Sequence, residues 1–187
     1  MDRKYAKLFA SGAALALAAT SLGATAVVAD NHEGYTIGVS NTVQGNGWRE
    51  EMICSIKAQA AELEDVTALN IAHRNTDAAG QLEDIRNLIA AGVDAIIVNA
   101  ADTEAINPAV KEATDSGIPV IAVDSAVSET SAWVLENNQQ EYARLGAEWL
   151  FEQLGGEGNV FYMRGLAGHS ADDDRDVGFK AALENYP

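Results

Sequence analysis

The sequence is poor in cysteine and in positive charge, and each shortage excludes a class of protein. Its 187 residues include a single cysteine, Cys54, so neither an internal disulfide nor a cysteine-built metal site can form. The 12 lysines and arginines are outnumbered by 28 acidic residues, which leaves a formal net charge of −16. This balance argues against a nucleic-acid partner and against a basic membrane-surface protein. The chain must therefore fold around an apolar core, and its 48% of hydrophobic residues is ordinary for that purpose.

The first 29 residues have the pattern of a secretory signal peptide. A basic start precedes an apolar, Ala-rich stretch from residue 8 to 22, and small residues at 27–29 offer a cleavage site. We expect export and cleavage after Ala29, with Ala26 as the alternative site. An uncleaved membrane anchor is less favoured, because Thr and Ser interrupt the apolar stretch.

Beyond this leader, apolar runs alternate with segments of helical periodicity. Runs without polar alternation predict buried parallel strands, and apolar residues spaced three and four apart predict helices between them. Strands are expected at 35–40, 66–73, 94–99, 118–124, 133–137 and 158–163. Helices are expected at 48–64, from an N-cap at Asp77 to Gly92, from an N-cap at Asn107 to Gly117, at 139–154 and at 171–185. The fold class is therefore α/β, with doubly wound parallel sheets covered on both faces.

A short, small and polar stretch at 125–132 is the only convincing linker. We expect residues 30–125 to form a first lobe, and 126–187 to form a hinge and the first part of a second lobe. That second part would hold only the strands at 133–137 and 158–163, too few for a stable buried sheet. The chain therefore reads as a C-terminally truncated fragment.

The sequence pattern assigns three residues to the core. Cys54 lies within a helical apolar pattern, and an unpaired cysteine in an oxidising compartment is safest when buried. Trp133 and Trp149 also follow apolar patterns that predict burial.

In parallel sheets, ligands bind at the carboxyl ends of the strands. After the first strand, Gly45 and Gly47 lack the spacing of a phosphate loop, and acidic residues in the next helical turn would repel a phosphate. A tight turn that presents Asn46 and Trp48 to a neutral ligand is favoured. Trp48 could offer a flat apolar face to a sugar ring or anchor the helix in the core.

The remaining polar clusters match no catalytic or metal site. His169 and Ser170 are neighbours in sequence and lack the nucleophile elbow of a hydrolase. The acidic run at 172–176 lacks the Gly and Glu of an EF-hand loop. It fits an acidic helix start, and the alternative is that one of its carboxylates points into a cleft. No catalytic residue, metal or cofactor is therefore expected. Asp124, which ends an apolar strand, could accept two hydroxyl hydrogen bonds or cap a turn.

Several of these stretches together resemble the periplasmic sugar-binding proteins of ABC importers, in particular their ribose-binding-like, type I branch. In chain order the similar stretches are 37–52, 81–124, 136–150 and 164–179. The resemblance implies lobes that close about a hinge on a monosaccharide or polyol, which is then delivered to a membrane permease without catalysis. It also implies a periplasmic location, a monomer and no nucleic-acid partner.

The resemblance implies a set of ligand-binding residues as well. By position, Asn41, Asn46 and Trp48 fall on the sugar loop of the first lobe. Asp124 falls on the hydroxyl-binding Asp at the hinge.

Other positions of the binding set depart from the family pattern. Ser125 replaces an Arg that often follows the hinge Asp. Asp173 stands where the second lobe contributes an Arg, and Arg175 matches a second Arg of that lobe. Arg49 occupies a position that is aromatic in many members. We expect Ser125, Asp173 and Arg175 to contribute to the site, and the sugar to differ from ribose.

Other functions are compatible with part of the pattern. A sensory or chemotaxis receptor would have the same fold and ligand chemistry, and the sequence does not separate it from a transport receptor. An exported α/β enzyme would need a nucleophile and a base that converge, and none is found. A repressor ligand domain is opposed by the export signal and by the lack of a basic DNA-binding helix pair.

Overall fold

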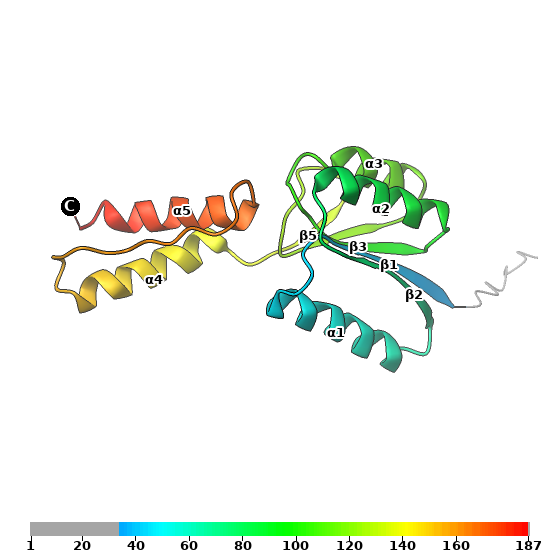
Figure 1. Cartoon of the computed structure of the whole chain (residues 1–187), viewed down its shortest axis with the longest axis horizontal. Helices are drawn as coiled ribbons and strands as arrows, with labels where there is room; N and C mark the ends of the chain where they lie inside the picture. The colour runs from blue at the N-terminus through cyan, green and yellow to red at the C-terminus, as the bar shows by residue number, and fades with distance from the viewer. Residues whose placement is uncertain (1–33, 187) are drawn as a thin grey trace, which may run out of the picture. The chain divides into compact units, whose positions relative to one another are not determined.

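The computed structural model describes residues 34–186, so the leader expected at 1–29 lies outside the described residues. The parallel strands and the helices alternate along the first part of the chain (Figure 1). The strands are β1 (Tyr35–Asn41), β2 (Val66–His73), β3 (Ala95–Asn99), β4 (Val120–Val123) and β5 (Trp133–Leu135). The helices are α1 (Gly47–Glu62), α2 (Ala78–Ala90), α3 (Asn107–Asp115), α4 (Gln139–Gln153) and α5 (Ser170–Leu183).

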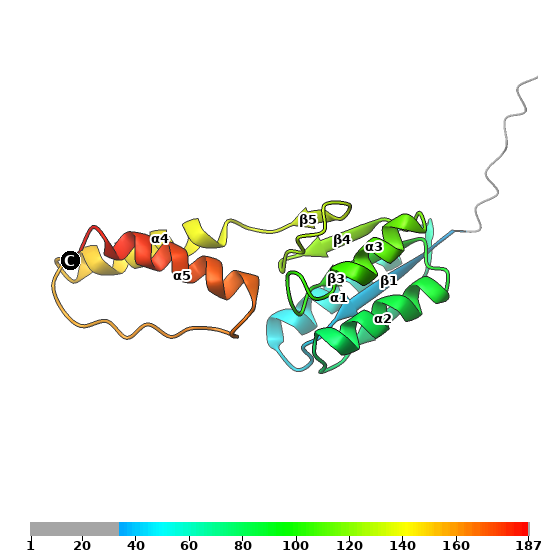
Figure 2. The same ribbon diagram turned by 90° about the horizontal axis from the view of Figure 1, so that it is seen from above.

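The strands form one parallel five-stranded sheet in the order β2-β1-β3-β4-β5. Helix α1 covers one face of the sheet, while α2 and α3 cover the other (Figures 1 and 2). The carboxyl ends of β1, β3 and β4 consequently meet at one edge. The expected α/β fold class with a doubly wound parallel sheet is confirmed.

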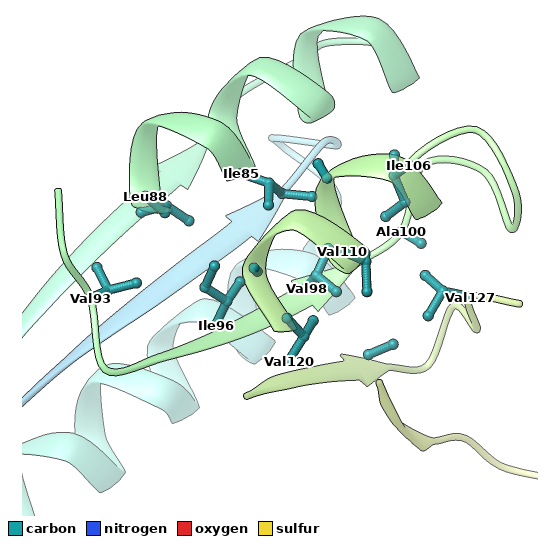
Figure 3. Packing of buried hydrophobic residues seen from close by; sticks show 13 residues of the cluster. Ile85, Leu88, Val93, Ile96, Val98, Ala100, Ile106, Val110, Val120 and Val127 are labelled. Atoms are coloured by element: carbon teal, nitrogen blue, oxygen red, sulfur yellow. The ribbon is translucent and has the colours of Figure 1, made fainter. Parts of the chain in front are cut away.

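The main core lies between the sheet and helices α2 and α3 (Figure 3). Ile85 of α2 and Val110 of α3 pack against Ile96 and Val98 of β3 and Val120 of β4, and each of these side chains is at most 1% exposed. Burying a side chain of this size stabilises the fold by roughly 1.5–3 kcal/mol. The apolar residues of the strands therefore stabilise the fold on the face of the sheet that α2 and α3 cover.

A buried polar side chain joins α2 to the edge of the sheet where the strands end. Gln81 is fully buried, and its amide nitrogen donates to the Ser40 hydroxyl and to the Asn99 carbonyl. Its carbonyl oxygen accepts from the Ala101 N–H at 2.7 Å. Because both ends of the amide are satisfied, Gln81 holds β1, β3 and α2 in register at little desolvation cost.

Helix ends follow local signals in the sequence. The Asp77 carboxylate accepts from the Gly80 N–H at 2.9 Å, so Asp77 is the N-cap of α2 as predicted. Gly92 and Gly117, which follow α2 and α3, have φ of 69° and 81°, a left-handed conformation that favours glycine. The prediction for α3 was one residue late: Asn107 is already helical, and the N-cap is Ile106, which makes no side-chain capping bond.

The strand at 133–135 has a different partner from the one expected. It pairs with β4 through Ile121–Trp133 and Val123–Leu135, so it is the fifth strand of the first sheet. The prediction that it opens the second lobe's sheet was wrong, and the polar stretch 125–132 is a loop between β4 and β5. Spacing along the sequence does not report which strand a segment pairs with. The division of the chain into lobes at residue 125 stays a prediction.

The segment at 158–163 does not form the expected strand. A strand requires a neighbour for its backbone N–H and C=O groups, and this segment pairs with no strand among residues 34–186. Its Phe161 side chain stands free of neighbours, and that of Met163 is 91% exposed.

All three residues assigned to the core are exposed. Trp133 and Trp149 are 73% and 63% exposed, and Cys54 is exposed on α1. In α1 the fully buried apolar side chain is Ile53, and its neighbour Cys54 points about 100° away around the helix. In the described part of the chain, no helix is long and apolar enough to cross a membrane.

Candidate functional site

A cavity of about 410 Å³ opens at the carboxyl ends of the strands, within the range of small-ligand pockets. It is bounded by the loop that follows β1, by the residue that follows β4 and by the start of α5 with the segment before it. Its lining residues are Val43, Asn46, Trp48, Arg49, Asp124, Gly165, Leu166, His169, Ala171, Asp172 and Arg175.

Asp124 follows β4 in a strained backbone conformation. Its φ is 64°, the one positive value at a residue other than glycine among residues 34–186. The Ser125 N–H donates to the Val123 carbonyl at 2.7 Å, which closes a tight three-residue turn around Asp124. A left-handed residue of this kind costs of order 1–3 kcal/mol and is typical of functional sites.

The carboxylate of Asp124 accepts no hydrogen bond and forms no ion pair within the described residues. It therefore caps neither a turn nor a helix, which was one of the alternatives for this residue. The other alternative remains: its oxygens are free to accept hydrogen bonds from a molecule in the cavity.

Arg49 enters the cavity from the first turn of α1. The residue is 7% exposed, and one guanidinium nitrogen (Nη1) donates to the side-chain oxygens of Asn41, at 2.7 Å, and of Asn99. Burial lowers the pKa of Arg49 and the negative charge of Asp124 opposes this shift, but an arginine remains charged near neutral pH. Its other nitrogen, Nη2, lies 3.2 Å from Nε2 of His169.

Trp48 and Asn46 lie at the same end of α1. Asn46 is the N-cap of the helix, and its side-chain oxygen accepts from the Arg49 N–H at 3.2 Å. Trp48 is 50% exposed beside the Arg49 guanidinium, which lies 5.8 Å from the ring centroid. The indole is therefore an accessible face on the cavity and not a core anchor.

His169 precedes α5 and faces Arg49. Its Nδ1 lies 3.3 Å from the Ala171 N–H, and its Nε2 faces the Arg49 guanidinium. A neutral imidazole has one acceptor nitrogen, so these two contacts compete. Burial, and next the charge of Arg49, lower the pKa of His169, which favours the neutral ring at neutral pH.

The first turn of α5 is fixed by Arg164. This guanidinium contacts both carboxylate oxygens of Asp172, with the shortest contact at 2.6 Å, and it also pairs with Asp173 and Asp176. The Gly165 N–H donates to Asp172 at 2.6 Å. The acidic run is therefore an arginine-binding cluster, and no group of three or more His, Cys, Asp or Glu side chains in residues 34–186 could hold a metal ion.

Two arginines of the cavity differ from the others in the described chain. Arg49 and Arg175 have no carboxylate within salt-bridge distance; Arg175 instead donates to the side-chain oxygen of Gln139 at 2.8 Å and lies over the Tyr142 ring. The other arginines among residues 34–186 all pair with acidic residues: Arg74, Arg86, Arg144 and Arg164. Unpaired guanidinium groups in so acidic a chain leave donor N–H groups available to a ligand.

The structure brings together four of the seven residues predicted for the site: Asn46, Trp48, Asp124 and Arg175. The others do not line the cavity. Asn41 and Ser125 are buried beside it at 1% exposure. Asp173 is directed to Arg164, with its side chain 66% exposed.

Arg49, His169 and Asp172 line the cavity but were not predicted as binding residues. Arg49 was noticed only as a departure from an aromatic position, although its place directly after Trp48 at a helix start was a usable signal. His169 was considered only as a catalytic residue and rejected. Asp172 was considered as part of an acidic helix start, with the alternative that one carboxylate of this run points into a cleft, and its place in the lining agrees with that alternative.

Comparison with known proteins identifies the family. The family profile described as a periplasmic binding protein domain matches residues 37–187. The chain belongs to this family. The galactofuranose-binding protein YtfQ of Escherichia coli is 32% identical over 158 residues, which are 81% of this chain and 49% of YtfQ. A xylitol-binding protein of Mycolicibacterium smegmatis is 31% identical over 189 residues, covering 98% of this chain and 52% of the relative.

Solved structures of periplasmic binding proteins share the fold. The fructose-binding periplasmic domain of a hybrid two-component system superposes with a TM-score of 0.76 at 29% identity, over 82% of this chain and 51% of that one. The chain thus spans about half the length of the relatives that it matches. These relatives are named for what they bind, in agreement with the expectation of a binding protein and not an enzyme.

The cluster around Arg164 predicts how the stability of this periplasmic binding protein depends on pH. Hydrogen bonds from Arg164, and then from the Gly165 N–H, lower the pKa of Asp172 below its usual value. A carboxylate with a depressed native pKa stabilises the fold above its unfolded pKa of about 3.9, and this contribution is lost as the pH falls through the native pKa. We expect the free energy of unfolding to decrease steadily below about pH 4.

Urea unfolding between pH 3 and 7 would test this dependence. Arg164→Met removes the cause of the shift, so the variant should be less stable at pH 7 and should lose less stability on acidification. Arg86→Met removes an exposed pair with Glu112 and should change both quantities less. Parallel pH dependence in the wild type and Arg164→Met would contradict the assignment.

Proposed function

We propose that the protein is an exported solute-binding receptor that captures a monosaccharide or polyol and delivers it to the membrane permease of an ABC importer. The observation that carries the proposal is the lining of the cavity. It combines the free carboxylate of Asp124, the unpaired guanidinium groups of Arg49 and Arg175, and the accessible indole of Trp48.

This lining suits a polyhydroxylated ligand. A sugar hydroxyl both donates and accepts: Asp124 can accept from it, and Arg49 and Arg175 can donate to it. Trp48 offers an apolar face to the C–H groups of a sugar ring. The names of the relatives, which refer to galactofuranose, xylitol and fructose, support a neutral sugar or polyol as the ligand.

Capture would occur by closure about a hinge. In this proposal residues 30–125 belong to a first lobe, whose sheet also includes β5, and residues 136–187 begin a second lobe. The ligand binds residues of both parts, and so favours the closed state. The receptor would act as a monomer in the periplasm, and the permease would bind the closed form.

Isothermal calorimetry with a panel of pentoses, hexoses and polyols would test the proposal. We expect at least one ligand to bind with a Kd in the micromolar range or lower, equivalent to about −8 kcal/mol. At a concentration 100 times Kd, the same ligand should stabilise the protein by about 2.7 kcal/mol, which a thermal unfolding scan would detect. Flat calorimetry together with an unchanged unfolding temperature across the panel would refute sugar binding.

A sensory receptor is the second candidate, favoured by the likeness to a domain of a hybrid two-component system. Both functions need the same ligand site, so binding measurements do not separate them. Affinity capture from membranes with ligand-loaded protein would do so. Recovery of an ABC permease supports import, and recovery of a membrane sensor kinase or chemoreceptor supports sensing.

A further inference from the structure

A chain of hydrogen bonds runs from the cavity to the end of β2, through residues that do not line the cavity. Arg49 Nη1 donates to the Asn41 side-chain oxygen at 2.7 Å, and the Asn41 side-chain nitrogen lies 2.7 Å from Nδ1 of His73. On the other side of the ring, His73 Nε2 lies 2.9 Å from a carboxylate oxygen of Glu50. The same oxygen accepts from the Gly45 N–H at 2.7 Å.

The two ends of this chain fix the direction of every bond in it. An arginine can only donate, so the Asn41 oxygen must face Arg49 and its NH₂ group must face His73. The hydrogen bond from Gly45, and next that from His73, lower the pKa of Glu50, which is therefore ionised and can only accept. His73 must then carry its proton on Nε2 and accept from Asn41 at Nδ1.

Asn41 has no N–H donor left for a ligand. Its two N–H donors are used by the Val43 carbonyl, at 2.9 Å, and by His73, and its oxygen is used by Arg49. The residue is 1% exposed and does not line the cavity. Its place in the chain of bonds indicates a supporting role rather than direct contact with the ligand.

We propose that His73 is a positioning residue for ligand binding: through Asn41 it sets the orientation of the Arg49 guanidinium in the cavity. Without an acceptor at Nδ1, the Asn41 amide keeps only its contacts with the Val43 carbonyl and with Arg49, so its oxygen is held less firmly against the guanidinium. The His73 side chain is 11% exposed and that of Glu50 is 44% exposed, so the imidazole is held largely inside the protein beside Asn41. The effect on ligand affinity rests on the proposed function, whereas the effect on Arg49 does not.

Two substitutions separate the two sides of the imidazole. In His73→Asn, the side-chain oxygen lies where Nδ1 was and still accepts from Asn41, but the contact with Glu50 is lost. In His73→Gln, the longer amide can donate to Glu50, but nothing accepts from Asn41. We expect His73→Asn to resemble the wild type and His73→Gln to be impaired.

The first readout is nitrogen NMR of the ligand-free protein. In the wild type, Nε2 of His73 should carry the proton and Nδ1 should not. The Arg49 side-chain resonances should be unchanged in His73→Asn and shifted in His73→Gln. A proton on Nδ1 in the wild type, or Arg49 resonances that respond equally to both substitutions, would overturn the proposal even if no sugar bound.

The second readout is affinity for the sugar or polyol that binds most tightly in the calorimetry panel. His73→Gln should weaken binding about tenfold, which corresponds to about 1.4 kcal/mol, and His73→Asn by less than about threefold. Asn75→Ala is the control. Asn75 accepts from the Gln44 N–H at 2.8 Å and so holds the loop that follows β1, but it does not contact Arg49. It should leave the Arg49 resonances unchanged; equal losses in Asn75→Ala and His73→Gln would assign the effect to loop loosening and overturn the proposal.

Discussion

Asp124→Asn is expected to weaken sugar binding by about 100-fold, equivalent to about 2.7 kcal/mol, without unfolding the protein. The substitution keeps the shape of the side chain and removes its charge. Charge-assisted hydrogen bonds to hydroxyls are roughly twice as strong as neutral ones. Because the carboxylate has no partner among residues 34–186, its removal breaks no hydrogen bond of the fold. Calorimetry and urea unfolding of the variant would measure both quantities.

Asp124→Gly extends this test, because it should abolish sugar binding without lowering stability. Glycine adopts the φ of 64° without strain, so the free energy of unfolding should stay the same or rise by up to about 1 kcal/mol, while sugar binding is lost. This result would show that the strained turn is retained for function and not for stability.

Asp102→Asn is the matched control for Asp124. The Asp102 carboxylate follows β3 and accepts from the N–H groups of Glu104 and Ala105, so it caps a turn and does not line the cavity. We expect slightly lower stability and unchanged affinity. If Asp124→Asn binds sugar as tightly as the wild type does, Asp124 is not a ligand contact.

Gly178→Ala should destabilise the protein by about 3 kcal/mol, because α4 and α5 approach each other too closely at this point for a side chain. A Cβ atom on Gly178 would lie 1.9 Å from the Gln140 carbonyl oxygen and 2.8 Å from its carbon. These are backbone atoms, so the contact cannot be relieved by rotating a side chain. The start of α5, which carries Asp172 and Arg175, would move away from α4. Sugar binding should therefore weaken as well.

Gly146→Ala is the matched control on the facing helix. Gly146 lies within α4, and a Cβ atom there would meet no atom within 4 Å. Alanine favours the helix over glycine by about 1 kcal/mol, so this variant should be more stable than the wild type. Thermal and urea unfolding would compare the two variants. A Gly178→Ala protein as stable as the wild type would show that the close approach of the helices is absent in solution.

Features with a local signal were predictable from the sequence. The N-cap at Asp77 and the glycines that follow α2 and α3 depend on residues a few positions apart, and the structure has them where the pattern indicated. The same holds for strands β1 to β5, whose apolar runs lack the regular polar alternation of a strand with one solvated face. The position of Asp124 at the end of such a strand placed it at the edge of the sheet where the cavity opens.

Some predictions were only partly correct, because the local pattern was right but the pairing or burial depended on residues distant in the sequence. The pattern at 133–135 indicated a strand correctly, but its pairing with β4 depends on residues across the loop. Trp133 and Trp149 fit apolar patterns, yet nothing among residues 34–186 covers them. Periodicity reports which side of an element is apolar and does not report whether another element packs there.

By itself, the sequence determined the α/β class and the order of the strands and helices as far as α4, and it predicted the end of the sheet where a ligand would bind, because these follow from short-range patterns of polarity and from turn residues. The tertiary structure decided which side chains reach the cavity. Arg49 and His169 are far apart in the sequence and meet only when α1 and α5 are in place, and the support of Arg49 by His73 exists only because β1 and β2 end side by side. Contacts of this kind depend on how the chain folds in three dimensions, which no local pattern encodes.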